Sequence, residues 1–380
     1  MPTPDFVHLR LHSEFSVSDG IVRIDEAVAR AAGDGMPALA ITDLANVFGM
    51  VKFYKAARAA GVKPVIGCDI WITNESERDK PHRVVLLVQS RQGYLRLSEL
   101  LTRAWLENQH RGRAEMKKSW FVEGTEGLIV LSGAMHGDVG VALLQDNRAQ
   151  AEQLAQEWAG FFPGRFYLEL QRPGSPHAES YVDAAVRLAG ACSLPVVATH
   201  PVQFLKPEDF TAHEARVCIA EGHVLGDQRR PRIFTRESYF LSQAEMGKRF
   251  ADLPEALANS VEIARRCNLS LELGKSRLPK FPTPDGASLE DYLAQTAGQG
   301  LDRRLAALYP DAARRAKEEP GYRQRLELET KTIVQMGFAG YFLIVADFIN
   351  WAKSNGVPVG PGRGSGAGSL VAYSLGITDL

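Results

Sequence analysis

A glycine-rich segment late in the sequence has the residue types of a phosphate-binding loop. Five glycines alternate from Gly360 to Gly368 around one cation, Arg363, and the hydroxyl of Ser365. Glycine lets backbone N–H groups approach an anion closely, because no side chains stand in the way. The apolar run 370–375 is predicted to form a helix whose N-terminus faces the same anion. The segment therefore predicts half of a phosphate site, because no residues that would do chemistry on the phosphate are visible nearby.

Other interpretations of the glycine-rich segment fit its residues less well. A P-loop has a lysine after the glycines and before a serine or threonine, and this segment has none. A dinucleotide-binding fingerprint is nearly met by Gly362, Gly364 and Ala367, but no second strand follows to carry a ribose-binding acid. A flexible linker is rarely followed at once by an apolar helix. The phosphate-binding loop remains the favoured interpretation.

A second group of polar residues accompanies the predicted strands. His8, Arg10 and His12 alternate along the first apolar segment, so their side chains share one face. Later strands are closed by further polar residues, namely Thr42, Asp43, Asp69, Glu169, Gln171, Thr199 and His200. Sites of βα barrels form at the C-terminal ends of the strands. The pattern predicts one shared pocket, although Asp43, Glu169 and His200 each have a purely local structural alternative.

Strand and helix patterns alternate over the first two thirds of the sequence. Apolar runs predict strands at residues 6–11, 38–42, 64–72, 83–88, 127–131, 165–170 and 194–199, with amphipathic helices between them. This alternation indicates parallel strands in a doubly wound sheet or a barrel. Prolines 279, 282 and 284 interrupt the pattern. Helical periodicity then predicts helices at 289–308, 322–335 and 340–354. We expect one domain over residues 1–275 and a second over 276–380.

Composition restricts the class of protein. The net charge is −1, so the chain lacks the basic excess of a free-standing DNA-binding domain. The four cysteines are far apart, which argues against disulfides or a cysteine zinc cluster and favours a cytoplasmic protein. The N-terminus does not resemble a signal peptide. The apolar stretch 338–349 is too short to span a bilayer, so we expect no membrane association.

Five segments together resemble a known family. The first is His8-Leu-Arg10-Leu-His12 with Asp19-Gly20, and the others are residues 41–49, 65–72, 166–174 and 198–204. They resemble the PHP (polymerase and histidinol phosphatase) domain, a distorted, TIM-like βα barrel that holds metal ions for phosphoester hydrolysis. The order of these segments, and the closing Pro-Val-Gly-Pro-Gly-Arg-Gly-Ser, resemble the N-terminal part of the bacterial replicative DNA polymerase III alpha family. The resemblance implies an α/β barrel followed by the mostly helical start of a palm domain.

The metal-binding pattern of the PHP family is incomplete in this sequence. The family's His-x-His is His8 followed by Arg10, a histidine is replaced by Leu44, and a late aspartate and histidine are replaced by Pro201 and Gln203. Arginine cannot ligate a metal because it has no lone pair to offer. The residues that stand at the other positions of this pattern, together with Arg10, form a vestigial metal pocket, namely His8, Arg10, Asp19, Asp43, Asp69 and His82. We expect no bound metal, and an ion-pair network centred on Arg10 in its place.

The polymerase resemblance assigns the glycine-rich loop to the triphosphate of an incoming nucleotide. It implies that Arg363 pairs with phosphate oxygens and that Gly364 and Ser365 donate hydrogen bonds to them. Polymerisation also needs Mg²⁺ held by aspartates of an Asp-x-Asp motif, which the family carries further along. We therefore expect these 380 residues alone to bind no cofactor and to synthesise no DNA.

The resemblance also implies partners. They are the proofreading exonuclease subunit and, for the full-length polymerase, primer–template DNA, dNTP, the sliding clamp and the clamp loader. Two alternatives stay open: a metal-dependent phosphoesterase or 3′–5′ exonuclease, and an unrelated βα-barrel enzyme with a nucleotide-binding tail. We further expect the segment beyond the prolines to be less well ordered or to self-associate, because an incomplete palm exposes apolar surface.

Overall fold

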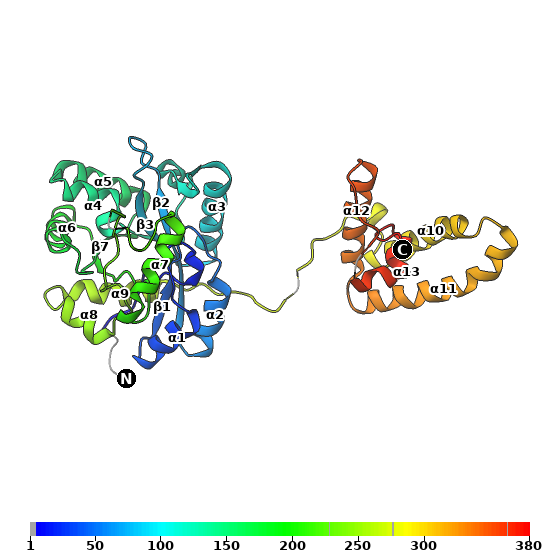
Figure 1. Cartoon of the computed structure of the whole chain (residues 1–380), viewed down its shortest axis with the longest axis horizontal. Coiled ribbons are helices and arrows are strands. Elements are labelled where there is room, and N and C mark those ends of the chain that lie inside the picture. The colour runs from blue at the N-terminus through cyan, green and yellow to red at the C-terminus, as the bar shows by residue number, and fades with distance from the viewer. Residues whose placement is uncertain (1–4, 228, 276, 363) are drawn as a thin grey trace. The chain divides into compact units, whose positions relative to one another are not determined.

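The computed structural model describes residues 5–227, 229–275, 277–362 and 364–380, and it contains two compact units (Figure 1). The first unit ends at Leu271 and the second begins at Glu272. The prolines predict a boundary slightly later, after residue 275. The predicted triphosphate contact Arg363 lies outside the described residues.

The first unit is built on an eight-stranded sheet. Its strands are β1 (Ala38–Ile41), β2 (Lys63–Ile72), β3 (His82–Val88), β4 (Gln109–His110), β5 (Arg113–Met116), β6 (Leu128–Leu131), β7 (Phe166–Leu170) and β8 (Val196–Ala198). They are ordered β4-β5-β2-β3-β6-β7-β8, and β1 pairs with β2. Residues 8–12 lie between β1 and the segment that follows β8: the Ala40 amide donates to the His8 carbonyl, and the His12 amide donates to the Val202 carbonyl. The predicted distorted α/β barrel is therefore confirmed.

Helices surround the sheet of the first unit (Figure 1). They are α1 (Ile24–Gly33), α2 (Met50–Ala59), α3 (Arg91–Glu107), α4 (Asp138–Leu144), α5 (Arg148–Phe161), α6 (Ala178–Cys192), α7 (Phe210–Glu221), α8 (Gln243–Arg249) and α9 (Pro254–Arg266). Short 3-10 helices span Glu14–Ser16, Lys118–Glu123, Ala134–His136 and Pro207–Asp209. Local signals set several of these boundaries. In α8, for example, Ser242 and Glu245 form a reciprocal capping box.

One strand runs against the predicted direction. β3 is antiparallel to both of its neighbours, β2 and β6. The prediction that the strands are parallel is therefore wrong for β3. The connection from β2 to β3, residues 73–81, contains no helix. A parallel connection needs a crossover of a dozen or more residues, so this short segment can only return the chain in the opposite direction.

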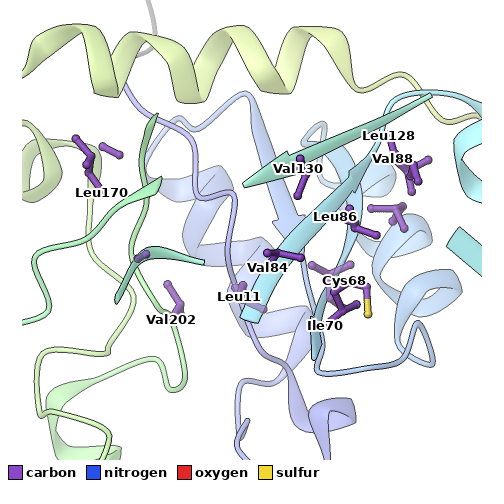
Figure 2. Close-up of a cluster of buried hydrophobic side chains, with 14 of the residues drawn as sticks. Leu11, Cys68, Ile70, Val84, Leu86, Val88, Leu128, Val130, Leu170 and Val202 are labelled. Atoms are coloured by element: carbon purple, nitrogen blue, oxygen red, sulfur yellow. The ribbon is translucent and has the colours of Figure 1, made fainter. Parts of the chain in front are cut away.

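Most strands of the sheet are buried on both faces, and the short edge strand β4 is the exception. Along β3, Val84, Leu86 and Val88 belong to the larger hydrophobic cluster, whereas Val85 and Leu87 belong to a second cluster that also includes residues of α9. Figure 2 shows part of the larger cluster, in which Leu11 and Val202 join side chains from β2, β3, β6 and β7. Burial on both faces explains why the strands read as continuous apolar runs in the sequence.

The second unit is helical, as predicted. It contains α10 (Leu289–Leu308), α11 (Ala312–Gln335), α12 (Ala339–Ser354) and α13 (Leu370–Ser374), with 3-10 helices at Pro284–Gly286 and Gly364–Gly368. α11 begins at Ala312 rather than at residue 322, because Asp311 caps it by accepting from the Arg314 amide at 2.8 Å, and Pro320 is accommodated inside it. α13 packs closely on α10: a Cβ at Gly300 would lie 1.9 Å from the Ser374 carbonyl oxygen.

Within the described part of the chain, no helix by itself is both long and apolar enough to cross a bilayer. α11 and α12 together meet the length and composition requirement, but they are bent by 113° at their junction.

Candidate functional site

Six charged side chains meet at the mouth of the barrel, and we call them the buried ion cluster. Its members are Arg10, His12, Asp19, Asp69, Arg83 and Glu169. Asp69, Glu169 and His12 are 0% exposed, and Arg10 is 5% exposed. The members come from residues 8–19, β2, β3 and β7, so closure of the barrel is what brings them together. At this depth each charge requires an opposite charge as a partner.

Arg10 bridges two strands of the barrel. One terminal nitrogen, Nη1, lies 3.2 and 3.1 Å from the two carboxylate oxygens of Glu169 on β7, and the other, Nη2, donates to Asp69 on β2. Burial by itself would lower the pKa of Arg10, but the two carboxylates outweigh burial and raise it. The guanidinium therefore stays charged and holds β2 and β7 together across the pocket.

Asp69 accepts hydrogen bonds from three cations. Besides Arg10, Nε and Nη2 of Arg83 donate to its two oxygens at 2.8 and 2.6 Å, and Nε2 of His12 lies 3.1 Å away. Burial would raise the pKa of Asp69, but Arg10 and Arg83 hold it well below its usual range. The antiparallel register explains why Arg83 takes part. Asp69 pairs with Val85, so Arg83, two residues along β3, lies on the same face.

His12 lies between two carboxylates. Its Nδ1 is 2.9 Å from Asp19 and its Nε2 is 3.1 Å from Asp69. Burial would lower the pKa of His12, but the two carboxylates raise it to about 9. The ring is therefore an imidazolium at neutral pH, and both of its nitrogens donate. Three cations then face three carboxylates, and the cluster is close to neutral.

Asp43 lies next to this cluster and binds a different set of partners. It accepts from the Ser13 amide at 2.6 Å, from the Ser13 hydroxyl at 2.9 Å and from the Ser16 hydroxyl at 3.3 Å. Burial raises the pKa of Asp43 to about 6. It therefore fixes the turn after residue 12, which in turn positions Asp19.

The two histidines of the predicted pocket have other surroundings. His8 shares the face of Arg10, but its Nε2 lies 2.8 Å from the Leu241 carbonyl, and burial lowers its pKa to about 4. His82 pairs with Ile72 in the β2–β3 register. Its side chain therefore lies on the face of β3 opposite to Arg83. Of the six predicted residues, the structure brings Arg10, Asp19 and Asp69 into one network and keeps His8 and His82 apart from it.

The alternation of Arg10 with His12 and the polar strand end at Glu169 predict that these residues share a pocket, and the structure brings all three into the network. The metal-binding pattern of the family includes neither His12 nor Glu169. Neither pattern predicts Arg83. Arg83 required knowledge of the β2–β3 register, which depends on the antiparallel turn.

A cavity of about 840 Å³ opens beside the buried ion cluster. Arg10 and Arg83 line it together with His82, His136 and Gln203. Burial lowers the pKa of His136 to about 4, so this side chain is neutral at physiological pH. The Oε1 atom of Gln203 is buried, and no hydrogen-bond partner for it is found among the described residues.

The side chains at the barrel mouth do not fit a metal centre. A metal needs neutral imidazoles and free carboxylate oxygens. Here the nitrogens of His12 both donate, and Asp69 is engaged by three cations. Leu44, which follows Asp43, offers no donor atom. Within the described ranges, no group of three or more His, Cys, Asp or Glu side chains has an arrangement that could hold a metal ion.

The predicted phosphate loop belongs to the second unit. Gly364 and Ser365 lie in the 3-10 helix Gly364–Gly368, and both are exposed. The loop is held at its two ends. The Asp379 amide donates to the Pro361 carbonyl at 2.8 Å, and the Ser369 hydroxyl donates to Glu329 at 2.9 Å.

The two units match two different protein families. Residues 8–173, within the barrel, match the PHP domain family. Residues 291–380, within the helical unit, match the family described as bacterial DNA polymerase III alpha NTPase domain. The barrel is therefore similar to PHP domains, and the helical unit is similar to the NTPase domain of that description.

Comparison with individual proteins extends this assignment over the whole chain. The chain is 56% identical over 383 residues to the DNA polymerase III subunit alpha of Neisseria meningitidis serogroup A, covering 100% of this chain and 34% of the relative. It is 52% identical to the same subunit of Pseudomonas aeruginosa and 49% identical to that of Vibrio cholerae, covering all of this chain and 32% and 33% of those relatives. The chain is thus similar over its whole length to proteins named DNA polymerase III subunit alpha, and it spans about a third of the length of these relatives.

Solved structures give weaker similarities. A protein from Bifidobacterium adolescentis named as a metal-dependent phosphoesterase aligns with a TM-score of 0.34 and 14% identity, over 53% of this chain and 88% of that one. An amidohydrolase from Chromobacterium violaceum aligns with a TM-score of 0.35 and 15% identity, over 52% of this chain and 87% of that one. These values are too low to support an argument about function.

Proposed function

We propose that this chain is the N-terminal part of the catalytic alpha subunit of a bacterial replicative DNA polymerase. The observation that carries the proposal is 49–56% identity across both units to proteins of that name. The complete protein would be a DNA-directed DNA polymerase, a cytoplasmic nucleotidyltransferase that extends primer–template DNA with dNTPs and Mg²⁺. The 380 residues alone contain no Asp-x-Asp motif to hold the metal ions, so they would not polymerise.

Primer extension tests this proposal directly. We expect the full-length subunit to add nucleotides to a primed template in the presence of Mg²⁺, and the 380-residue chain to add none under the same conditions. An inactive full-length subunit would contradict the proposed function. Metal-dependent addition by the 380 residues would contradict the expectation that the catalytic carboxylates lie further along.

We propose that the glycine-rich loop binds the triphosphate of the incoming nucleotide through Arg363, Gly364 and Ser365. Support comes from the exposure of Gly364 and Ser365 and from the NTPase domain match, which includes the loop. An exposed backbone without side chains leaves N–H groups accessible to phosphate oxygens.

We propose that the PHP barrel is metal-free and structural. The buried ion cluster supports this role, because its cations already neutralise the carboxylates that a metal would need. Metal analysis of the purified chain tests it. Sub-stoichiometric zinc and manganese are expected, whereas two or more ions per chain that depend on the pocket residues would overturn the proposal.

The family relationship also suggests partners for the barrel. We propose that it docks the proofreading exonuclease subunit, and that the full-length protein works with the sliding clamp and the clamp loader. Co-purification of the exonuclease subunit with the complete chain tests docking. The alternative function, a metal-dependent phosphoesterase or 3′–5′ exonuclease, predicts hydrolysis that a chelator abolishes.

A further inference from the structure

A carboxylate on α11 holds the end of the glycine-rich loop. One oxygen of Glu329, Oε2, accepts from the Ser369 hydroxyl at 2.9 Å and from the Val371 amide at 3.2 Å. Ser369 is the last residue before α13, and Val371 lies in its first turn. Glu329 therefore fixes the point where the loop enters this short helix.

The other oxygen of Glu329 is fixed by a cation one turn earlier on α11. Nε of Arg325 donates to Oε1 at 2.6 Å. Burial would raise the pKa of Glu329, but Arg325 and the two loop donors lower it. The carboxylate is therefore ionised at neutral pH, and its hydrogen bonds to the loop are of the stronger, charge-assisted kind. Because Arg325 restrains the Glu329 side chain, that side chain loses little conformational freedom when it binds the loop.

The other end of the loop is held independently. The Asp379 amide donates to the Pro361 carbonyl at 2.8 Å, and the Asp379 carboxylate is bound by Arg304 at 2.9 Å and Lys353 at 2.7 Å. Between these two attachments lies the exposed 3-10 helix Gly364–Gly368, in which three of the five residues are glycine. Such a segment has almost no side chains with which to pack, so its position depends on its ends.

We infer that Glu329 is a positioning residue of the triphosphate site. It does not touch the nucleotide, but it holds Ser369 and the start of α13 so that the backbone donors of residues 364–368 stay in one arrangement. This inference rests on the proposed function of the loop. Preorganised donors bind an anion more tightly than donors that must first be ordered, so loss of Glu329 weakens nucleotide binding more than it slows the chemical step.

The test uses the full-length polymerase and single-nucleotide incorporation on a primed template. Glu329→Ala removes the acceptor and is expected to raise the KM for dNTP about tenfold, while kcat and the Kd for DNA change less than about threefold. Glu329→Gln keeps one oxygen that can accept from both loop donors but loses the charge and the contact with Arg325, so its KM is expected to lie between those of the wild type and Glu329→Ala. Glu327→Ala is the matched control, because Glu327 is exposed on the same helix.

Glu329→Asp protects the test against misfolding of the alanine variant. It retains the charge but shortens the side chain, so it cannot reach Arg325 and the loop together, and an intermediate KM is expected. A wild-type KM in both Glu329→Ala and Glu329→Asp, or a loss confined to kcat, would overturn the inference. A wild-type polymerase that adds no nucleotide would instead refute the proposed function itself.

Discussion

Replacing Arg10 by methionine should destabilise the barrel strongly. Methionine fills much of the same volume but removes the only cation that contacts Glu169 among the described residues. Asp69 would keep Arg83 and His12. Glu169 would keep only neutral donors, the hydroxyl of Thr199 at 2.5 Å and the amide of Gln171 at 2.9 Å. Arg10→Met therefore leaves one buried carboxylate without a counter-charge.

The size of the effect follows from that burial. Glu169 is 0% exposed, and removing one partner of a buried ion pair costs about 3–5 kcal/mol. A loss of this size is a large part of the roughly 5–15 kcal/mol that stabilises a typical protein. At about 2–4 °C per kcal/mol, the melting temperature of the barrel should fall by about 10 °C.

Thermal and urea unfolding followed by circular dichroism would measure this loss. Arg229→Ala is the control, because the Arg229 side chain is 92% exposed and its pair with Asp227 should contribute under about 1 kcal/mol. Adding Glu169→Gln to Arg10→Met removes the uncompensated charge and should restore part of the stability. A loss below about 1 kcal/mol for Arg10→Met, or a double variant no more stable than Arg10→Met alone, would refute the reasoning.

Two further predictions concern pH and the second unit. The pKa of His12 is raised to about 9 in the folded chain, so its contribution to the unfolding free energy is fully present below about pH 6.5 and is lost as the pH rises through 9. The loss is about 3 kcal/mol and should be absent in His12→Gln, whereas an equal alkaline decline in both proteins would argue against this assignment. Limited proteolysis should digest the second unit before the barrel, because Phe348 and Trp351 are 55% and 63% exposed on α12. Equal resistance of the two units would count against that expectation.

The sequence predicts the barrel well because its strands are buried on both faces and alternate with amphipathic helices. It fails at β3, where the length of the preceding connection decides the direction and apolar content carries no directional signal. The alternation of Arg10 and His12 places both side chains on one face. The role of Arg83 follows from a pairing register that no local pattern in the sequence encodes.

In the second unit, composition identifies the glycine-rich loop, but no local pattern in the sequence predicts which residues hold the loop in place. Glu329 lies forty residues before Ser369 in the sequence. Glu327 and Glu329 are both acidic residues on the same charged helix, so the sequence does not distinguish them. Only the packing of α11 against α13 shows that Glu329 contacts the loop.

The contacts of Asp69 with three cations limit which single substitutions this barrel can accept. Arg10, Arg83 and His12 come from different segments, and each neutralises part of the same set of carboxylates. Replacing one of them alone by a metal ligand leaves the other two in place to repel an incoming cation, while the fold loses stability at once. Building a metal site here would require several coordinated substitutions, each unfavourable by itself. The buried ion cluster therefore resists stepwise conversion into a metal site, because each single replacement leaves buried charges without partners.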